Sequence, residues 1–208
     1  MKIALYDIDY TLIPFDSFYK FVLLLLKNKP ANLVKLPGLI FFGILTLLKF
    51  MPLTDYKSKW LALTEHLNDD ELDILSKQFV ETEVIPFLKK DAPETIDQYR
   101  KDGYLIVFAT ASFEFYLKYL ALHFNADLFF GTEIEVKNGK RTIKGVNCKG
   151  MEKINRIKHS IGSAEIVRYA SIGFSDSMSD YPFTKLVGTF NIVHKKSWVI
   201  KKIYAQQT

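Results

Sequence analysis

Short, continuous apolar runs alternate with longer helix-like patterns through most of the chain. The runs that predict buried strands lie at residues 3–6, 104–109, 126–130, 169–173 and 188–193. The patterns that predict helices lie between and after these runs, at residues 91–102, 113–124, 149–161, 180–186 and 197–204. Continuous apolar strands that alternate with helices are typical of a parallel sheet covered on both faces. The pattern therefore predicts an α/β fold, a Rossmann-like parallel sheet with helices on both faces.

The region of residues 15–87 interrupts this alternation. It is rich in apolar residues and lysines, and it carries only helical patterns, at residues 18–26, 33–51, 55–66 and 69–84. Pro30 disfavours helix for the residue before it, so the first two patterns predict a helical hairpin. A strand hairpin is predicted at residues 132–137 and 142–146, around the turn signal Asn138-Gly139. The sequence thus predicts one α/β domain with a helical insert.

The longest uncharged run of the insert, residues 36–48, lies between Lys35 and Lys49. Its thirteen residues fall short of the roughly 20 apolar residues that cross a bilayer. An apolar stretch beside lysines has the composition of a segment that lies in a membrane interface. Packing against the protein's own core is the alternative, and the sequence leaves both open.

The chain carries a net charge of +5 and has an isoelectric point near 9.0, which indicates an anionic partner. Nucleic acid, a phosphorylated substrate and an anionic membrane surface all meet that description. Basic and aromatic residues are not interleaved on one strand face, so we expect no nucleic acid. A phosphorylated small-molecule or lipid substrate remains, together with peripheral association with an anionic membrane.

Cellular location is indicated by two features. Cys148 is the only cysteine, which excludes an internal disulfide and fits a reducing compartment. Asp7 and Asp9 interrupt the first apolar run, so no signal peptide is predicted. We expect a cytoplasmic protein, with a peripheral position on the inner face of the membrane as the variant that the apolar insert suggests.

The most informative stretch for chemistry is Asp7-Ile8-Asp9-Tyr10-Thr11, directly after the first predicted strand. Because side chains alternate along a strand, Asp7 and Asp9 are expected on the same side. Two like charges that close repel each other unless a cation or a proton lies between them. The pair, with the hydroxyl of Thr11, predicts a Mg²⁺ site in which one aspartate is a nucleophile and the other carries a proton.

Two further groups of candidate residues lie at a strand end and at a helix start. Thr110-Ala111-Ser112 ends the strand at 104–109 and precedes a helix, so it offers hydroxyls and free backbone N–H groups to an oxyanion. Lys149 opens the helix after the strand hairpin. A point cation there would neutralise both a phosphoryl group and the nucleophile's carboxylate. Taken singly, these residues also fit an ordinary strand end and a solvated lysine.

The last candidates are Asp176 and Asp180, four residues apart after the strand at 169–173. Asp176 is a candidate metal ligand, and Asp180 a carboxylate that supports the ligands. A turn and a helix cap are the alternative roles for these two acids. The carboxyl ends of parallel strands meet at one edge of a sheet, so all four groups of residues are expected at one site.

At these residues the chain resembles the haloacid dehalogenase superfamily of phosphatases. Residues 7–11 look like its first motif, usually D-x-D-G/S-T, with Tyr10 an unusual middle residue. The other motifs are matched by Thr110 for the second, Lys149 for the third, and Asp176 with Asp180 for the fourth. The resemblance implies a hydrolase core of residues 1–14 and 88–208 and a helical cap subdomain of residues 15–87.

Within that superfamily, the helical cap resembles the phosphoserine-phosphatase-like branch. Two features depart from phosphoserine phosphatases. Residues 175–180 replace the G-D-G-x-N-D pattern, and Asp16 stands where those enzymes tend to carry a Glu for the substrate amine. The lysine-rich apolar cap is instead similar to phosphatidylglycerophosphate phosphatases of the same branch. The resemblance thus leaves two substrate classes, a lipid phosphomonoester and a small soluble phosphomonoester.

The resemblance implies a Mg²⁺-dependent phosphatase. Asp7 would attack phosphorus to give an aspartyl phosphate, and Asp9 would move the protons. Mg²⁺ would be held by Asp7, the main-chain carbonyl of Asp9, and Asp176. The residues expected to bind substrate are Thr11, Thr110, Ala111, Ser112 and Lys149, with Lys57 and Lys59 for an anionic substrate tail. Asp180 would orient Lys149 or metal-bound water.

Two other functions are compatible with parts of this pattern. A phosphotransferase that passes the phosphoryl group to an alcohol would use the same residues. A non-enzymatic membrane-surface module on a hydrolase fold predicts the loss of a residue among Asp7, Asp9, Lys149 and Asp176, and none is lost. The sequence therefore favours an enzyme.

Overall fold

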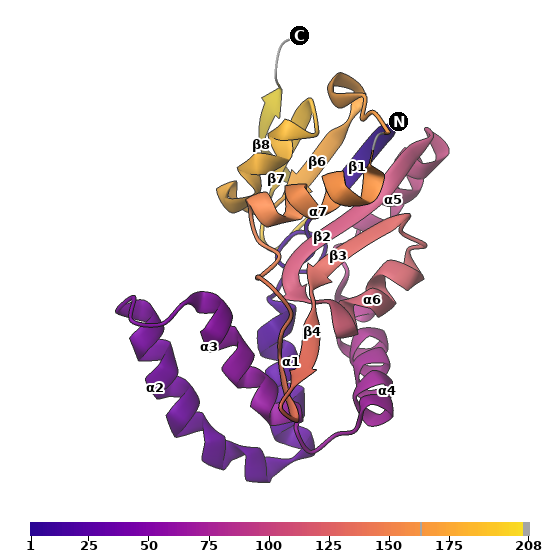
Figure 1. Cartoon of the computed structure of the whole chain (residues 1–208). Coiled ribbons are helices and arrows are strands. Elements are labelled where there is room, and N and C mark those ends of the chain that lie inside the picture. Colours follow the sequence, from indigo (N-terminus) through magenta and orange to yellow (C-terminus); the bar gives the residue numbers. More distant parts are fainter. Residues whose placement is uncertain (163, 206–208) are drawn as a thin grey trace.

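The computed structural model describes residues 1–162 and 164–205. At its centre is a six-stranded sheet in the order β3-β2-β1-β6-β7-β8 (Figure 1). The strands are β1 Lys2–Tyr6, β2 Tyr104–Phe113, β3 Leu128–Thr132, β6 Ile172–Ser175, β7 Thr189–Val193 and β8 Ile200–Ala205. Neighbouring strands are parallel except β8, which pairs antiparallel with β7. The predicted α/β fold is confirmed.

The sheet is covered on both faces because its central strands are apolar on both sides. In β1, Ala4 and Tyr6 pack into one hydrophobic cluster, and Ile3 and Leu5 pack into another. The first cluster includes side chains of α5 (Ala92–Lys101) and α6 (Glu114–His123), and the second includes side chains of α7 (Met151–Ile161). This alternation of β1 side chains between two cores fixes the site at its end in the middle of the sheet.

Two predicted helices differ in the structure. Of the predicted helix at residues 197–204, residues 200–204 belong to strand β8, with Val193 of β7 opposite Ile200. Pairing with the free edge of β7 satisfies backbone groups that would otherwise remain open there, and this outweighs the helical pattern. Residues 180–186 fall within a 3₁₀ helix, Met178–Lys185, that contains Pro182. The predicted hairpin forms around Asn138-Gly139 as β4 Ile134–Lys137 and β5 Lys140–Ile143, so its second strand begins and ends earlier than the expected residues 142–146.

The insert between β1 and β2 is helical, as expected. Its elements are α1 Ser17–Asn28, a 3₁₀ helix Pro30–Lys35, α2 Leu36–Leu47, α3 Leu53–Trp60, a 3₁₀ helix Leu61–Thr64, α4 Asp69–Phe79, a π-helical turn Val80–Val84 and a 3₁₀ turn Ile85–Phe87. Figure 1 shows these helices gathered beyond one end of the sheet, with α2 and α3 extending furthest from it. The division of the chain into a core and a cap at residues 14 and 88 stays a prediction.

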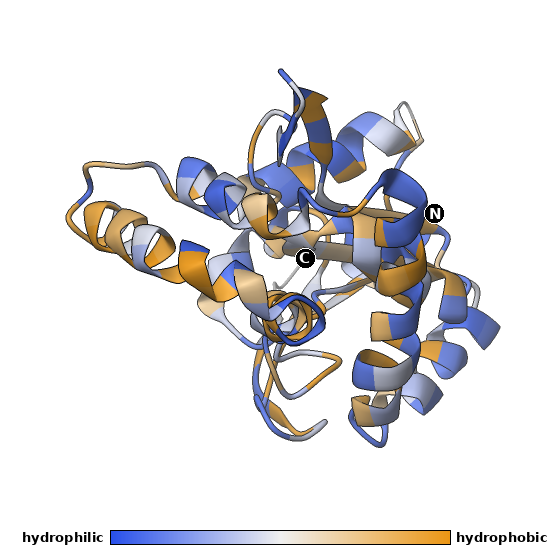
Figure 2. Ribbon diagram, turned by 90° about the horizontal axis from the view of Figure 1, so that it is seen from below, coloured by the Kyte–Doolittle hydropathy of each residue, from blue (hydrophilic) through white to orange (hydrophobic). Residues whose placement is uncertain are grey.

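Helix α2 exposes most of its apolar surface. Of its side chains only Leu39 is buried. The exposed apolar residues of this arm, which we define as residues 30–53, are Leu33, Val34, Ile40, Phe41, Ile44, Leu47, Leu48, Phe50 and Leu53. Figure 2 shows hydrophobic residues along this projecting helix. The segment Pro30–Leu47 is 18 residues long and only 11% buried.

This segment is longer than the uncharged run of residues 36–48, because the helical structure already begins at Pro30. By length and composition alone it meets the requirement for crossing a membrane, contrary to the expectation from the shorter run. Those two properties are weak evidence for a span. The firm observation is an apolar helix with little protein against it.

Candidate active site

Asp7 lies directly after β1, at its carboxyl end. Its N–H donates to the Phe174 carbonyl over 3.0 Å, so the pairing with β6 continues through this residue. Asp7 is 7% exposed, and its Oδ2 accepts a hydrogen bond from the Thr11 hydroxyl at 3.3 Å. Burial raises the pKa of Asp7 to about 7, while the charge of Lys153 opposes the rise. The strand thus delivers a buried carboxylate to the sheet edge.

Lys153 is the cation beside Asp7, and the sequence analysis missed it. Its Nζ lies 2.8 Å from Asp7 Oδ1 and 2.9 Å from Asp180 Oδ2. Burial alone would lower the pKa of Lys153, but these two carboxylates hold it above its usual value. The three side chains form a buried ion cluster at the ends of β1 and β6.

We expected Lys149 in this position, and the structure places Lys153 there instead. The reason is where α7 begins. Gly150 has a φ of +58° and the helix starts at Met151, so Lys149 precedes the helix and is exposed. Lys153 lies on the inward face of α7 with Ile157, four residues later. A lysine in register with the apolar positions of a helix was the available signal.

Asp9 is held by two donors. Its Oδ1 accepts from the Ser17 N–H at 2.8 Å, and its Oδ2 accepts a short hydrogen bond from the Ser112 hydroxyl. Burial raises the pKa of Asp9 to about 6, and the nearby Asp16 adds to the rise, while Ser112 and Ser17 oppose it. A carboxyl group that titrates near neutrality suits proton transfer.

The second strand end meets Asp9 as predicted. Strand β2 continues past Ala109 to Phe113, so Thr110, Ala111 and Ser112 are still part of the strand. Thr110 is fully buried, and its hydroxyl accepts from the Ser112 N–H at 3.0 Å. Ser112 therefore has a defined task in this structure, which is to hold the Asp9 carboxylate.

Asp176 and Asp180 lie just after β6, on the other side of β1. Asp180 is 2% exposed, and its Oδ2 accepts from Lys153 and from the Ser175 hydroxyl, each at 2.9 Å. The expected link from Asp180 to Lys149 is thus a link to Lys153. Burial raises the pKa of Asp176, and Lys195, 3.7 Å from its Oδ2, opposes the rise.

The donor set at this edge fits a magnesium ion. Residues 1–162 and 164–205 contain no group of three acidic, histidine or cysteine side chains placed to hold a metal. Mg²⁺ does not require one, because one or two carboxylates suffice and several waters remain bound. Asp180 interacts electrostatically with both Asp7 and Asp176. Within the described residues, its Oδ1 is buried without a hydrogen-bond partner, so the acidic edge has unused capacity for a cation.

A pocket of about 170 Å³ opens beside Asp9. The core contributes polar groups to the lining, namely Asp9, Ser112, Asn147 and Lys149, and Asp16 at the start of the insert adds another. The insert contributes Phe18, Tyr19, Leu53, Tyr56, Lys57 and Trp60. The pocket is therefore polar at its catalytic end and aromatic toward the insert, and Lys149 belongs to it even though Lys153 contacts Asp7.

Lys57 reaches this pocket from α3. Its ammonium donates a short hydrogen bond to the Ala111 carbonyl and a second, at 3.2 Å, to Asn147 Oδ1. It also lies 4.7 Å from the ring centroid of Phe113. Burial lowers the pKa of Lys57 to about 8, although Asp9 and Asp16 oppose this. Lys57 thus connects the insert to the second strand end.

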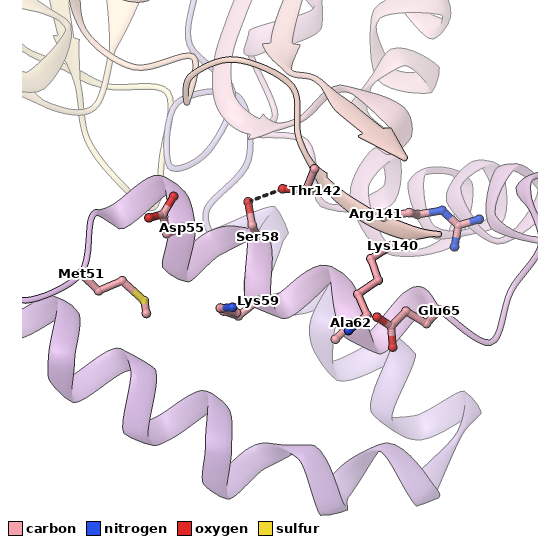
Figure 3. Close-up of a pocket in the computed structure, with 9 residues that line it drawn as sticks. All are labelled: Met51, Asp55, Ser58, Lys59, Ala62, Glu65, Lys140, Arg141 and Thr142. Atoms are coloured by element: carbon pink, nitrogen blue, oxygen red, sulfur yellow. Dashed lines mark hydrogen bonds between the residues drawn. The ribbon is translucent and has the colours of Figure 1, made fainter. Parts of the chain in front are cut away.

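Lys59, the second lysine expected to bind substrate, lies elsewhere. Its Nζ is 5.2 Å from the ring centroid of Phe42 on α2. Figure 3 shows it in a separate cavity of about 400 Å³, together with Asp55, Glu65 and Lys140. The two lysines are two residues apart on a helix, so they face different directions. Only Lys57 is placed at the candidate site.

The fold and these side chains define a class of enzyme, a hydrolase with a Rossmann-like core and a buried aspartate at the carboxyl end of its first strand. The haloacid dehalogenase-like hydrolase family matches residues 4–185, and the chain belongs to this family. The family expected from the sequence is confirmed at this level. A comparison with curated proteins finds no match.

Solved structures show the same fold. A Bordetella pertussis protein of unknown function has a TM-score of 0.78 at 22% identity, with 92% of this chain and 89% of that chain covered. A phosphoserine phosphohydrolase-like protein from Francisella tularensis has a TM-score of 0.61 at 18% identity, with 93% and 87% covered. A phospho-aspartyl intermediate analogue of phosphoserine phosphatase has a TM-score of 0.57 at 18% identity, with 92% and 86% covered.

Proposed function

We propose that the chain is a Mg²⁺-dependent phosphomonoester phosphatase that works through an aspartyl phosphate on Asp7. The observation that carries the proposal is the buried ion pair in which Lys153 favours the ionised form of Asp7, next to a second buried carboxyl group, Asp9, that Ser17 and Ser112 hold in place. A nucleophile needs an ionised carboxylate, and a proton carrier needs a pKa near the working pH. Family membership and the phosphatase-like structural neighbours support this reading.

In the first step, a carboxylate oxygen of Asp7 forms a bond to phosphorus while the bond from phosphorus to the ester oxygen breaks. The carboxyl group of Asp9 gives its proton to the leaving oxygen, so the alcohol departs neutral. Lys153 and Thr11 both contact the Asp7 carboxylate and limit its rotation. Ser112 and Ser17 hold Asp9 in the same way.

In the second step, the Asp9 carboxylate takes a proton from water, and the water oxygen attacks phosphorus. The bond between phosphorus and Asp7 breaks, which releases inorganic phosphate and restores both aspartates. Thr110, the Ala111 N–H and Lys149 would bind the phosphoryl oxygens. Asp180 anchors Lys153, so Lys153 would hold the remaining oxygen of Asp7 in place through both steps.

Mg²⁺ would be held by the carboxylates of Asp7 and Asp176 and the main-chain carbonyl of Asp9, with Asp180 supporting them. When bound, it would neutralise negative charge on the transferring phosphoryl group. Lys195 lies 3.7 Å from Asp176 Oδ2, at the edge of this candidate ligand set.

For the substrate, we favour a lipid phosphomonoester such as a phosphatidylglycerophosphate. A pocket of about 170 Å³ leaves no room for acyl chains, so any lipid tail must leave it past Leu53, Tyr56 and Trp60. Leu53 belongs both to this lining and to the exposed apolar arm. The apolar path from pocket to arm fits a substrate that is held at a membrane surface.

In this version the protein is cytoplasmic and associates peripherally with the inner face of an anionic membrane. A small soluble phosphomonoester is the alternative substrate class. It would use the same catalytic residues, with Asp16 and Lys57 as the polar groups that meet its leaving group. A phosphotransferase would also use these residues and differs only in the acceptor of the phosphoryl group.

A panel of phosphomonoesters tests the proposal directly. Serine, choline, sugar and lipid phosphates are incubated with the protein and Mg²⁺, and released inorganic phosphate is measured, with Asp7→Asn as the control. The proposal expects release from at least one class by the wild type and none by the variant. Product analysis with an added alcohol separates hydrolysis from transfer. If no substrate releases phosphate, the non-enzymatic module becomes the better account.

A further inference from the structure

Lys89 is a buried cation that the proposed mechanism does not use. It lies between the last turn of the insert and α5, and it is 4% exposed. In the part of the chain that the structure describes, no carboxylate lies within ion-pair distance of its ammonium. Burial lowers the pKa of Lys89 to about 8, with Asp176 and Asp7 opposing. Burying a charge without a carboxylate partner is costly, so its contacts call for an explanation.

The ammonium of Lys89 is bound by two main-chain carbonyls from distant loops. It donates to the Tyr10 carbonyl at 2.6 Å and to the His194 carbonyl at 2.7 Å. The Lys89 N–H donates to the Leu12 carbonyl at 2.9 Å, so the backbone of Lys89 is fixed to the same loop as its side chain. Lys89 therefore joins the loop after β1 to the loop after β7.

Tyr10 is the residue in this loop that needs support. Its φ is +56°, in the left-handed region that favours glycine. A non-glycine residue in such a conformation is strained and persists only when its surroundings impose it. The turn at Tyr10 brings Thr11 back so that its hydroxyl reaches Asp7 at 3.3 Å. The strained residue thus lies between the two candidate catalytic aspartates and the hydroxyl that contacts one of them.

A second lysine strengthens the same connection. Lys195, directly after His194, lies 5.0 Å from the ring centroid of Tyr10 and pairs with Asp176 at 3.7 Å. The loop that Lys89 binds through His194 thus also contacts Tyr10 and a candidate metal ligand. The contacts of Lys89 and Lys195 meet at Tyr10 from two sides, on its carbonyl and on its ring.

We propose that Lys89 is a positioning residue that holds Tyr10 in its left-handed conformation and thereby fixes the loop that carries Asp7, Asp9 and Thr11. The role of the loop in catalysis rests on the proposed function. The conformation of the loop does not depend on it. Glycine at position 10 would adopt the same φ without this support, so the need for Lys89 follows from the side chain at position 10.

The test compares Lys89→Met, which removes the two ammonium hydrogen bonds, with Lys90→Met, its exposed neighbour. Amide hydrogen exchange at Tyr10, whose N–H donates to the Phe15 carbonyl at 3.2 Å, is measured in the wild type and in both variants without substrate. Exchange is expected to become roughly tenfold faster in Lys89→Met and to stay unchanged in Lys90→Met. Equal exchange at Tyr10 in Lys89→Met and wild type overturns the inference, whatever the activity of the enzyme.

The kinetic arm uses Tyr10→Gly as a rescue. Lys89→Met is expected to lower kcat by roughly 10- to 100-fold with little change in KM, because the catalytic groups shift while the pocket stays intact. In a Tyr10→Gly background, the same Lys89→Met change is expected to cost less than half as much on a logarithmic scale. An undiminished cost means that Lys89 acts on something other than Tyr10, and the inference fails.

A variant that does not fold and an enzyme without measurable activity still give a decisive result. If Lys89→Met alone does not fold, the double variant with Tyr10→Gly is expected to fold, and failure of both overturns the inference. If the wild type has no phosphatase activity on any substrate, the proposed function fails, but the exchange comparison at Tyr10 still decides the role of Lys89. The two proposals are thus separated by readouts that do not share a substrate.

Discussion

Lys153 Nζ lies 2.8 Å from Asp7 Oδ1, deep between the ends of β1 and β6. The same ammonium contacts Asp180 at 2.9 Å, so one buried cation serves two buried carboxylates. Removing one partner from such a cluster leaves charges without compensation, which typically costs about 3–5 kcal/mol of stability. The arrangement therefore predicts linked effects on stability and on catalysis.

The first prediction concerns this lysine. Lys153→Met should lower kcat by roughly 100- to 1,000-fold, the loss expected when one preorganised electrostatic group is removed. It should also destabilise the fold, because Asp7 and Asp180 then repel each other without a cation between them. Steady-state kinetics and urea unfolding measure the two effects.

Lys149→Met is the matched control. It should change KM and leave the unfolding midpoint in place, because Lys149 is exposed at the pocket. A large loss of kcat and of stability in Lys149→Met, with little change in Lys153→Met, would show that Lys149 is the lysine that acts on Asp7.

The second prediction is for the nucleophile. Asp7→Asn should abolish turnover with the fold retained, because the amide is nearly isosteric with the carboxylate but is a poor nucleophile. Circular dichroism checks the fold, and phosphate release checks the activity. Activity near that of the wild type would remove Asp7 from the proposed mechanism.

How much of this site the sequence predicts depends on the kind of relationship involved. The strand before Asp7 was predictable, because Ile3 to Tyr6 form a short continuous apolar run that is typical of a strand covered on both faces. For Asp9 and Ser112, the sequence predicted only that both residues lie at the same edge of the sheet. Its hydrogen bond depends on β2 continuing past Ala109, where the register to β3 shifts. No local pattern encodes such a shift.

The lysine beside Asp7 was missed for a related reason. Choosing between Lys149 and Lys153 requires the first residue of α7 to within one position, and the ends of helices are the part of a pattern that sequence fixes least. Strand β8 was missed because pairing with an open sheet edge is a tertiary effect. Lys89 was missed because its partners are two main-chain carbonyls, which leave no trace in the sequence.

The third prediction uses the pKa of Asp9. Its pKa of about 6 in the folded protein lies above the usual value of 3.8, mainly because of burial. A raised carboxyl pKa means that the folded state binds more protons than the unfolded state between these two values. Stability therefore falls as pH rises from about 4 to about 6, and the linked loss is on the order of 3 kcal/mol. Asp7, with a pKa of about 7, contributes in the same direction.

Asp9→Asn isolates this contribution. In metal-free buffer, the thermal midpoint of the variant should match or fall below that of the wild type at pH 4 and exceed it at pH 7. The variant should also lose most of its turnover, because the amide cannot carry a proton. Parallel stability curves for variant and wild type across this pH range would show that the Asp9 pKa is not raised.

The last prediction concerns the exposed arm. Apolar burial gives a helix its depth in an interface, while each lysine adds about 1 kcal/mol against anionic headgroups. Lys49 is exposed just after α2, whereas Lys35 before it is paired with Glu65 at 3.4 Å. The wild type should float with anionic vesicles at low salt and be released at high salt. Phe41 and Leu48, 56% and 60% exposed, should carry this binding. Phe41→Ser with Leu48→Ser should abolish flotation and leave the thermal midpoint nearly unchanged.

Leu39→Ser is the control from the buried side of the same helix, since Leu39 is 4% exposed. It should cost stability and spare the binding surface. Wild-type protein that stays in the soluble fraction at low salt would contradict the membrane proposal and make a small soluble phosphomonoester the preferred substrate class.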